Sequence, residues 1–484
     1  MGSGGSKKPK WLPTIPRFPR VGGVAAMGEV AVKELQGWVR GEVIFPGDAR
    51  YDESRKVYNG MIDRRPAVIV RCTSVADVIA AMKAARAEGL NVSIRGGGHS
   101  VPGFGTADGA MMVDLSRMKG IRVDPATKTV RAEGGCTWGD YNHATHAFGL
   151  ASTGGVVSTT GIAGLTLGGG IGYLCRSAGL SLDNLLSADV VLADGSFVTA
   201  RKDVSPDLFW ALRGGGGNFG VVTNFEFRLH AVKDIVGGPM FFEVEDAPEV
   251  MRAFDRYMTD APRQLYAVFA WQIAPPLAFI PEDRHGDTFC ALVLCWTGPR
   301  DQADKVFAPL RGAAKVVAQY VAPMPYPALN SLFDALLPHG LQNYWKTVFA
   351  KELTDEAIEA HVAHGPRVPT VNSTMHIYPI NGAVHDVAPE ATAFGHRDVK
   401  YATVIAGVWP DPAQNEANTR WVRDYHKALV PYSEEGGYIN FASGDDADRV
   451  RANYGRYYDG LVDVKTKYDP SNVFRFNQNI TRGR

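Results

Sequence analysis

The amino-acid sequence predicts an α+β protein of two domains, in which a second domain, built on an antiparallel sheet flanked by helices, is inserted into the first. The chain has 484 residues, which is longer than one hydrophobic core usually organises. Glycine-rich loops and short strand-like segments occupy the first half, whereas helical and strand-like patterns alternate from about residue 238 onward. Between Tyr438 and Ile480 the composition of the first half returns, which predicts that the chain comes back to the first domain.

The predicted domain boundaries follow these changes in composition. Residues 1–35 form an N-terminal lead that starts like an artificial linker and not like a secretory signal. Residues 36–238 form the first domain, residues 239–436 the inserted domain, and residues 437–484 the segment that returns.

The first domain opens with a βαβ-like unit. Residues 67–70 predict a buried strand, and Ser74 with Asp77 predicts a capping box for a helix that Gly89 ends. Residues 92–94 predict a second strand. Two hairpins follow, at residues 121–131 and, around an Asp-Gly turn, at 190–199.

The inserted domain mixes helical and strand-like patterns. Helices are predicted at residues 248–259, 301–310 and 354–364. Strands are predicted at residues 267–271, 289–296, 373–378 and 401–409.

Composition excludes several classes of function. Lys plus Arg and Asp plus Glu each number 51, so no basic excess exists to hold nucleic acid. No apolar run is long enough to span a bilayer. The five scattered cysteines form no zinc-like cluster, so we expect no metal site and a reducing compartment such as the cytoplasm, with secretion as the alternative if a signal was removed.

Glycine-rich loops carry the main functional signal, because their backbone amides can approach phosphate oxygens closely. Residues 215–220 match the dinucleotide fingerprint as a string, but they follow a helix and precede a strand, which excludes a Rossmann phosphate turn. Residues 95–100 do follow a strand, and a triple glycine before His-Ser is unusual in an ordinary turn. With a second run at 168–172, they predict a pyrophosphate-bearing cofactor, either FAD or another dinucleotide.

These strings resemble the FAD-linked oxidases of the vanillyl-alcohol-oxidase type, with their p-cresol-methylhydroxylase-type (PCMH-type) FAD domain, and within them the berberine-bridge-enzyme-like branch. The resemblance is weakest over residues 240–370 and otherwise extends from about residue 60 to the end. The matching strings lie at 95–100, 134–135, 168–172, 187–191 with 194–195, 208–214, 218–222, 438–441, 454–455, 467–475 and 477–480.

The resemblance implies a PCMH-type FAD-binding fold in which His99 bonds covalently to the 8α-methyl group of FAD. Many relatives form a second bond through a cysteine, but Gly161 occupies that place here, so a single 8α-histidyl bond is expected. Cys175 lies after the second glycine run and is expected to be a core residue. The residues implied in cofactor binding are His99, Arg95, Gly96, Gly97, Gly98, Ser100, Gly134, Ser158, Thr159, Thr160, Gly161, Gly164, Gly168, Gly169, Gly170, Gly172, Gly220, Val222, Tyr438, Asn440 and Asn477.

The implied reaction is oxidation of an alcohol or sugar hydroxyl, for example of an oligosaccharide such as cellobiose to its lactone, with dioxygen reduced to hydrogen peroxide. Tyr438 is the first candidate for the catalytic base, because its Tyr-x-Asn motif resembles one that relatives place beside the flavin; a hydrogen-bonded core tyrosine is the alternative. Other polar candidates are His376 and Tyr378, which strand spacing places on one face, and Tyr401.

The expected partners are a small-molecule substrate and dioxygen, without nucleic acid or membrane, in a monomer or homodimer. Gly164 is expected to leave room for dioxygen beside the flavin, which favours an oxidase over a dehydrogenase that uses another acceptor. Two alternatives stay open: an amine, alkaloid or secondary-metabolite oxidase, and a pocket protein without flavin.

Overall fold

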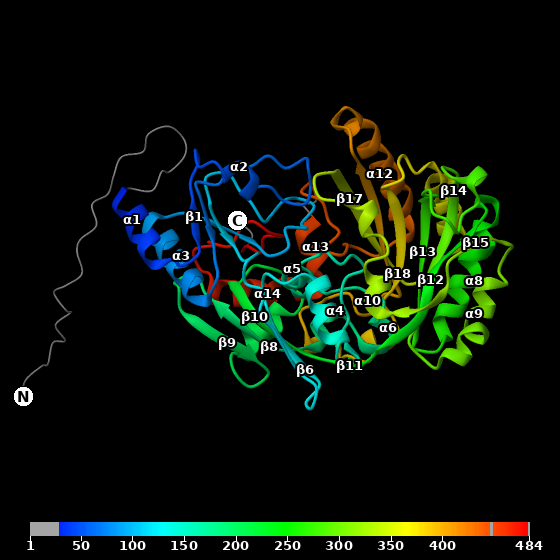
Figure 1. Cartoon of the computed structure of the whole chain (residues 1–484), viewed down its shortest axis with the longest axis horizontal. Coiled ribbons are helices and arrows are strands. Elements are labelled where there is room, and N and C mark those ends of the chain that lie inside the picture. Colours follow the sequence, from blue (N-terminus) through cyan, green and yellow to red (C-terminus); the bar gives the residue numbers. More distant parts are fainter. Residues whose placement is uncertain (1–28, 446–448, 483–484) are drawn as a thin grey trace, which may run out of the picture.

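Two lobes lie side by side along the long axis of the molecule (Figure 1). This computed structural model describes residues 29–445 and 449–482. The two-sheet lobe contains a four-stranded and a five-stranded sheet, and the large-sheet lobe contains an eight-stranded sheet. The α+β class is therefore confirmed. The start of the predicted lead, residues 1–28, lies outside the described residues.

The four-stranded sheet has the order β1-β2-β4-β3, and β4 runs parallel to both of its neighbours. The Ser74 hydroxyl accepts the N–H of Asp77 and Gly89 ends the helix in the left-handed region, as predicted. The Asp77 carboxylate does not complete the predicted capping box, because it accepts the N–H groups of Arg40, Gly41 and Thr73. The elements are β1 (Glu42–Ile44), β2 (Val68–Arg71), α3 (Val75–Glu88), β3 (Val92–Arg95) and β4 (Met111–Asp114), with α1 (Glu29–Trp38) and α2 (Tyr51–Ser54) before and between them.

The five-stranded sheet is antiparallel throughout, in the order β5-β6-β10-β8-β9, and it contains both predicted hairpins. Its strands are β5 (Ile121–Asp124), β6 (Thr129–Glu133), β8 (Leu185–Val191), β9 (Phe197–Arg201) and β10 (Val221–Arg228). The two-stranded pair is β7 (Leu150–Ala151) with β11 (His230–Ala231). Helices of this region are α4 (Trp138–His146), α5 (Ile162–Gly168), α6 (Cys175–Ala178) and α7 (Pro206–Leu212).

The first strand of the large sheet begins at Asp234, five residues before the domain boundary expected at residue 239. The strand order is β15-β12-β14-β13-β18-β19-β17, and β16 also pairs with β12. The four predicted strands and three predicted helices are present, whereas β12, β17 and α12 were not predicted. Strands are β12 (Asp234–Phe242), β13 (Leu265–Ile273), β14 (Thr288–Trp296), β15 (Val316–Gln319), β16 (Ala322–Pro325), β17 (Gln342–Ala350), β18 (Thr374–Pro379) and β19 (Tyr401–Trp409). Helices are α8 (Ala247–Asp260), α9 (Ala303–Arg311), α10 (Tyr326–Asn330), α11 (Asp355–His364) and α12 (Asn415–Leu429).

The two faces of the large sheet have different roles. One face packs against α8, α9, α11 and α12 in a core that includes Phe254, Trp271 and Tyr425. The other face belongs to a second core that joins it to residues of the two-sheet lobe, such as Tyr173 and Leu180. A ligand held between the lobes therefore meets only one set of alternating side chains from each strand.

The end of the chain returns to the two-sheet lobe, where the red helices α13 (Val450–Tyr454) and α14 (Tyr458–Tyr468) lie in Figure 1. Tyr454 and Leu461 are part of the same core as Phe225 of β10. Lys465 is buried, and its ammonium donates to the Asn218 carbonyl and the Asp469 carboxylate.

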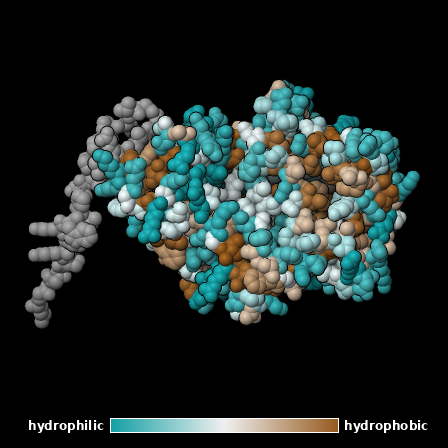
Figure 2. Space-filling view, viewed as in Figure 1, coloured by the Kyte–Doolittle hydropathy of each residue, from teal (hydrophilic) through white to brown (hydrophobic). Residues whose placement is uncertain are grey.

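Hydrophilic and hydrophobic residues are interspersed over the face shown in Figure 2. No helix among residues 29–445 and 449–482 is long and apolar enough to cross a membrane.

Candidate cofactor and substrate site

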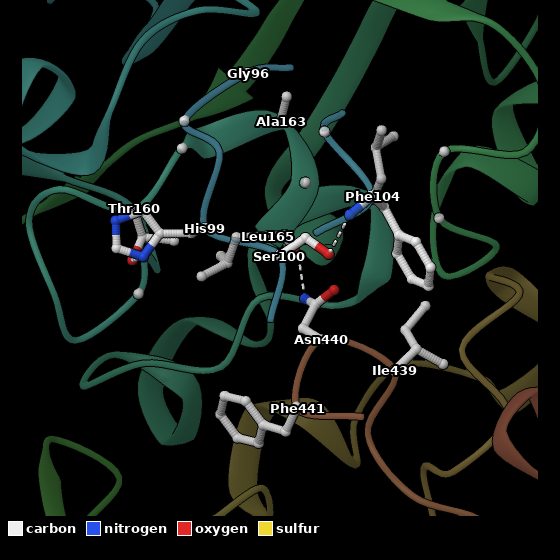
Figure 3. Close-up of a pocket in the computed structure, with 18 of the residues that line it drawn as sticks. Gly96, His99, Ser100, Phe104, Thr160, Ala163, Leu165, Ile439, Asn440 and Phe441 are labelled. Atoms are coloured by element: carbon white, nitrogen blue, oxygen red, sulfur yellow. Dashed lines mark hydrogen bonds between the residues drawn. The ribbon is translucent and has the colours of Figure 1, made fainter. Parts of the chain in front are cut away.

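A cavity of about 310 Å³ lies between the two lobes. The glycine loop 96–100 and helix α5 form one side of it, strands β17, β18 and β19 form another, and the segments 439–441 and 474–478 complete it. Figure 3 shows His99 beside Thr160, and Asn440 between Ile439 and Phe441 on a segment that faces Ser100. The cavity thus collects residues from the beginning, middle and end of the sequence.

The glycine loop presents free backbone amides to this cavity. Within the described part of the chain, none of the N–H groups from Gly96 to Ser100 donates a hydrogen bond. Gly98 has a φ of 72°, which a residue with a side chain rarely adopts. A row of unsatisfied amides in such a turn can bind anionic oxygens, which is the role expected of this loop from the sequence.

A close approach of two backbones shapes this side of the cavity. A Cβ atom on Gly161 would lie 2.4 Å from the backbone nitrogen of Gly97, and a Cβ on Gly97 would lie 2.4 Å from that of Gly161. In contrast, a Cβ on Gly164 would meet no atom within 4 Å. Gly161 is therefore required by packing, whereas Gly164 leaves open space in the cavity wall.

His99 is held by both hydroxyl and aromatic neighbours. The Thr159 Oγ1 atom lies 2.9 Å from Nε2, and the Thr160 Oγ1 atom lies 3.4 Å from Nδ1. The ring of Tyr58 stacks on the imidazole with 4.1 Å between ring centroids, and His339 packs edge-on against both rings. Burial, together with the nearby His339, lowers the pKa of His99 to about 3. The imidazole is therefore neutral, which is the nucleophilic form.

Apolar side chains form a further part of the cavity wall. They include Val92, Ile94 and Phe474. Nearby, the Asn477 amide nitrogen donates to the Gly217 and Phe474 carbonyls, while its buried Oδ1 atom has no partner among the described residues. An apolar slot, a row of free amides, an orphaned acceptor and a neutral histidine together fit a flavin dinucleotide.

Alternating residues of two neighbouring strands form the opposite wall. Thr374, His376 and Tyr378 of β18 face the cavity, and the small side chains Val404 and Ala406 of β19 lie next to them. These small residues leave a hollow beside the polar row. Trp345 of β17, which pairs with Ala406, closes the hollow on its far side.

His376 and Tyr378 form a hydrogen-bonded pair in this hollow. Their Nδ1 and hydroxyl oxygen atoms lie 2.7 Å apart. Burial lowers the pKa of His376 to about 4 and raises the pKa of Tyr378, so both are neutral near pH 7. We therefore assign the Tyr378 hydroxyl as the donor and the His376 Nδ1 atom as the acceptor. This arrangement can move a proton from the tyrosine oxygen to the imidazole.

The cavity wall carries no formal charge. Among the described residues that line it, none is Asp, Glu, Lys or Arg. The Thr374 hydroxyl donates its hydrogen to the Trp271 carbonyl, so it can only accept a hydrogen bond from a ligand. The buried Trp345 Nε1–H has no partner among the described residues and remains available to a ligand.

The structure brings about half of the predicted cofactor residues into the cavity wall. These are Gly96, Gly97, Gly98, His99, Ser100, Thr160, Gly161, Gly164, Gly220, Val222, Asn440 and Asn477. The predicted residues outside the wall are Arg95, Gly134, Ser158, Thr159, Gly168, Gly169, Gly170, Gly172 and Tyr438.

The second glycine run packs against protein atoms. A Cβ on Gly168 would meet the Asn440 side chain at 2.2 Å, and one on Gly172 would meet the Gly154 carbonyl oxygen at 1.7 Å. The Arg95 guanidinium donates to the Ser54 carbonyl. These residues shape the site from behind and do not line it.

The structure places two of the predicted base candidates outside the cavity wall. The Tyr438 hydroxyl is buried and accepts hydrogen bonds from the Gly170 N–H and the Asn440 amide, at 2.7 and 2.8 Å. Burial raises the pKa of Tyr438. Tyr401 faces the opposite side of the large sheet, where its hydroxyl donates to Asp255.

Several residues of the site were not predicted. Tyr58 and His339 contact His99 from distant parts of the chain, and no sequence motif marks them. Val404 and Ala406 could have been recognised from the two-residue period of their strand, given that His376 and Tyr378 face the same way.

Comparison with known proteins shows the family to which the chain is similar. A family model for the FAD binding domain matches residues 66–201, and a model described as berberine and berberine like matches residues 437–481. An FAD-linked oxidoreductase of Dictyostelium discoideum is 32% identical over 455 residues, covering 93% of this chain and 96% of that protein. The (R)-6-hydroxynicotine oxidase of Paenarthrobacter nicotinovorans is 30% identical over 456 residues, covering 91% and 97%.

A solved structure shares the arrangement of most of the chain. It is that of 6-hydroxy-D-nicotine oxidase from Arthrobacter nicotinovorans, with a TM-score of 0.81 and 29% identity, and the match covers 91% of this chain and 98% of that one. Similarity therefore extends over both lobes and over the segment that completes the cavity.

Proposed function

From the premise that this chain belongs to the berberine-like FAD-linked oxidoreductases, we propose that it is an oxidase of uncharged alcohols that carries FAD covalently on His99. FAD, when bound, supplies the acceptor for the two electrons that leave the substrate carbon and passes them to dioxygen, which becomes hydrogen peroxide. The observation that carries the choice of substrate is the cavity wall without formal charge.

The proposed cofactor contacts divide along the cavity. The amides of the loop 96–100 hold phosphate oxygens, the slot around Phe474 holds an aromatic ring, and the free Asn477 oxygen accepts a hydrogen bond. His99 forms a single covalent bond. A second attachment at position 161 is excluded from the proposal, because a side chain there would collide with the backbone of Gly97.

Tyr378 and His376 are proposed as the proton relay for the substrate hydroxyl. The Tyr378 oxygen takes the hydroxyl proton as its own proton passes to Nδ1 of His376. Tyr438 was the first candidate from the sequence, but its oxygen already accepts two hydrogen bonds. In this proposal Tyr438 instead holds Asn440 and the backbone of Gly170 in place.

The polar groups of the hollow favour an apolar alcohol over a sugar. Among the described residues of the sheet wall, free hydrogen-bonding positions are few: the Tyr378–His376 pair, the Trp345 N–H and the lone pairs of the Thr374 hydroxyl. A sugar ring would leave several buried hydroxyls unpaired, at a cost of roughly 1–3 kcal/mol each. An alcohol with one or two oxygen atoms and an aromatic or aliphatic body meets the apolar residues Leu337, Val404 and Phe441 instead.

Dioxygen is the proposed electron acceptor. Gly164 lines the cavity, and the open space beside its Cα would admit a small molecule. This observation favours an oxidase over a dehydrogenase.

Oxidation of a neutral amine is the second candidate. The similarity to (R)-6-hydroxynicotine oxidase favours it, and the uncharged wall would accept an amine only in its unprotonated form.

A peroxide-coupled assay tests the proposal with substrates that share one reacting group. Neutral para-methylbenzyl alcohol should exceed the anionic para-carboxybenzyl alcohol and the cationic para-aminomethylbenzyl alcohol in kcat/KM by about 100-fold or more. Cellobiose and benzylamine provide the sugar and amine comparisons. Faster turnover of cellobiose, or of either charged alcohol, would contradict the proposed substrate class, and faster turnover of benzylamine would favour the second candidate.

A further inference from the structure

We infer that Thr159, Tyr58 and His339 form a positioning set that holds the His99 imidazole in the tautomer and orientation required for covalent attachment of FAD, and that docking of the large-sheet lobe completes this set. The inference rests on the proposed attachment of FAD to His99. None of the three residues is assigned a catalytic role.

The two ring nitrogens of His99 differ in how closely a hydroxyl contacts them. The Thr159 hydroxyl lies 2.9 Å from Nε2, whereas the Thr160 hydroxyl lies 3.4 Å from Nδ1. If Thr159 accepts the Nε2–H, the lone pair of Nδ1 is free and only weakly contacted. In this proposal Thr159 takes the acceptor role, which favours the tautomer in which Nδ1 is the nucleophile.

The aromatic neighbours fix the plane of the imidazole. Tyr58 is stacked on it with an interplanar angle of 16°, and His339 stands perpendicular to both rings at centroid distances of 5.2 and 5.4 Å. A stacked ring on one face and an edge-on ring beside it leave the imidazole little freedom to rotate.

The large-sheet lobe holds this set through two groups of contacts. In the first group, the Gly340 N–H donates to the Tyr58 carbonyl and the Gly60 N–H donates to the Leu341 carbonyl. Asn59 bridges the same two segments, because its amide exchanges hydrogen bonds with the backbone of Asn343. The positions of Tyr58 and His339 are therefore set by contacts between the lobes.

The second group acts on Thr159. The Asp334 carboxylate accepts hydrogen bonds from both the N–H and the hydroxyl of Ser158, which precedes Thr159 in the chain. The Asn330 amide donates to the Gly155 carbonyl in the same loop. Each member of the positioning set thus either lies in residues 330–343 of the large-sheet lobe or is tied to them through its own backbone or a neighbour in its loop.

The attachment step balances with dioxygen as the oxidant, as in the proposed function. One C–H bond of the 8α-methyl group and the N–H bond of His99 break, and one bond forms between Nδ1 and that carbon. Dioxygen takes up the two electrons and two protons released, giving hydrogen peroxide. Thr159 contacts the nitrogen that loses its proton.

The test compares variants by the fraction of bound flavin that stays with the protein after acid precipitation, which is independent of turnover. Purified variants are incubated with excess FAD, and attachment is followed by in-gel flavin fluorescence. Thr159→Val should still bind FAD but attach it about tenfold more slowly or worse, and Thr159→Ser should restore the rate. Asp334→Ala should also slow attachment, because it releases Ser158.

A second pair of variants, at Tyr58, keeps the test decisive if Thr159→Val does not fold. Tyr58→Phe retains the stacked ring and should attach FAD normally, whereas Tyr58→Leu should not. Attachment at the wild-type rate in Thr159→Val, or in Tyr58→Leu, would overturn the inference, as would alkylation at Nε2 in the isolated flavin peptide. Absence of covalent flavin in the wild-type protein would instead overturn the proposed attachment itself, and the inference with it.

Discussion

Tyr378 is the residue on which the proposed chemistry depends most directly. Its hydroxyl reaches the cavity, and its proton has an acceptor 2.7 Å away on His376. Because burial raises the pKa of Tyr378, the hydroxyl acts as a base only if it gives up its own proton in the same step.

Tyr378→Phe should slow anaerobic reduction of the flavin by substrate by about 100-fold or more, since it removes the proton relay but keeps the ring. Flavin content should not change. Stopped-flow measurement of flavin absorbance gives the rate. Tyr401→Phe is the matched control, because it removes a hydroxyl on the opposite face of the same sheet and should leave the rate unchanged. A larger loss in Tyr438→Phe than in Tyr378→Phe would return the role of base to Tyr438.

At the scale of elements, two loops far apart in the sequence meet at Gly97 and Gly161. Their backbones come too close for any side chain, so the glycine at each position is explained by the contact and not by the flexibility of a turn. Both glycines line the same cavity as His99.

Gly161→Ala should lower the free energy of unfolding by about 1–3 kcal/mol or more, because its methyl group would lie 2.4 Å from the backbone nitrogen of Gly97. Gly164→Ala, also in the cavity wall, should be close to neutral, since no atom lies within 4 Å of its new methyl group. Thermal unfolding of the two variants at equal flavin content measures the difference. Equal stability of the two variants would show that the loops can separate without cost.

Local signals in the sequence predicted elements well. Ser74, Gly89 and the Asp194-Gly195 turn act within a few residues, so the α3 helix and the β8–β9 hairpin were predicted correctly. Strand β17 was not predicted. It forms by pairing with β19, about sixty residues away in the sequence, and no local signal marks such a pairing.

The site was predicted in part, for the same reason. The loop 95–100 is a continuous string and was recognised, and His376 with Tyr378 was recognised from strand spacing. The Tyr-x-Asn motif identified Tyr438 but could not predict the direction in which its side chain points. In the folded protein the ring packs against Gly169, and its hydroxyl accepts the N–H of Gly170. Contacts such as His339 with His99 depend on docking between lobes, which no local pattern encodes.

At the scale of the whole molecule, the lobes share one cavity, and histidines with lowered pKa values lie on both sides of the large sheet. His376 faces the cavity, while His361 of α11 is buried on the opposite side and hydrogen-bonded to Tyr425. Burial lowers the pKa of His361 to about 3 and that of His376 to about 4. The folded protein therefore keeps both uncharged at pH values where an unfolded chain would protonate them.

Stability should consequently fall as the pH decreases from about 6.5 to about 4, because the unfolded chain binds protons at these two positions and the folded one does not. In this range each histidine adds up to about 1.4 kcal/mol per pH unit to the slope of the unfolding free energy against pH. Above about pH 6.5 neither histidine adds to this slope. His361→Gln removes one titrating group without touching the cavity, so its unfolding free energy, measured with denaturant at several pH values, should depend less steeply on pH than that of the wild type. An unchanged slope in His361→Gln would mean that His361 is protonated in the folded protein, which contradicts its burial.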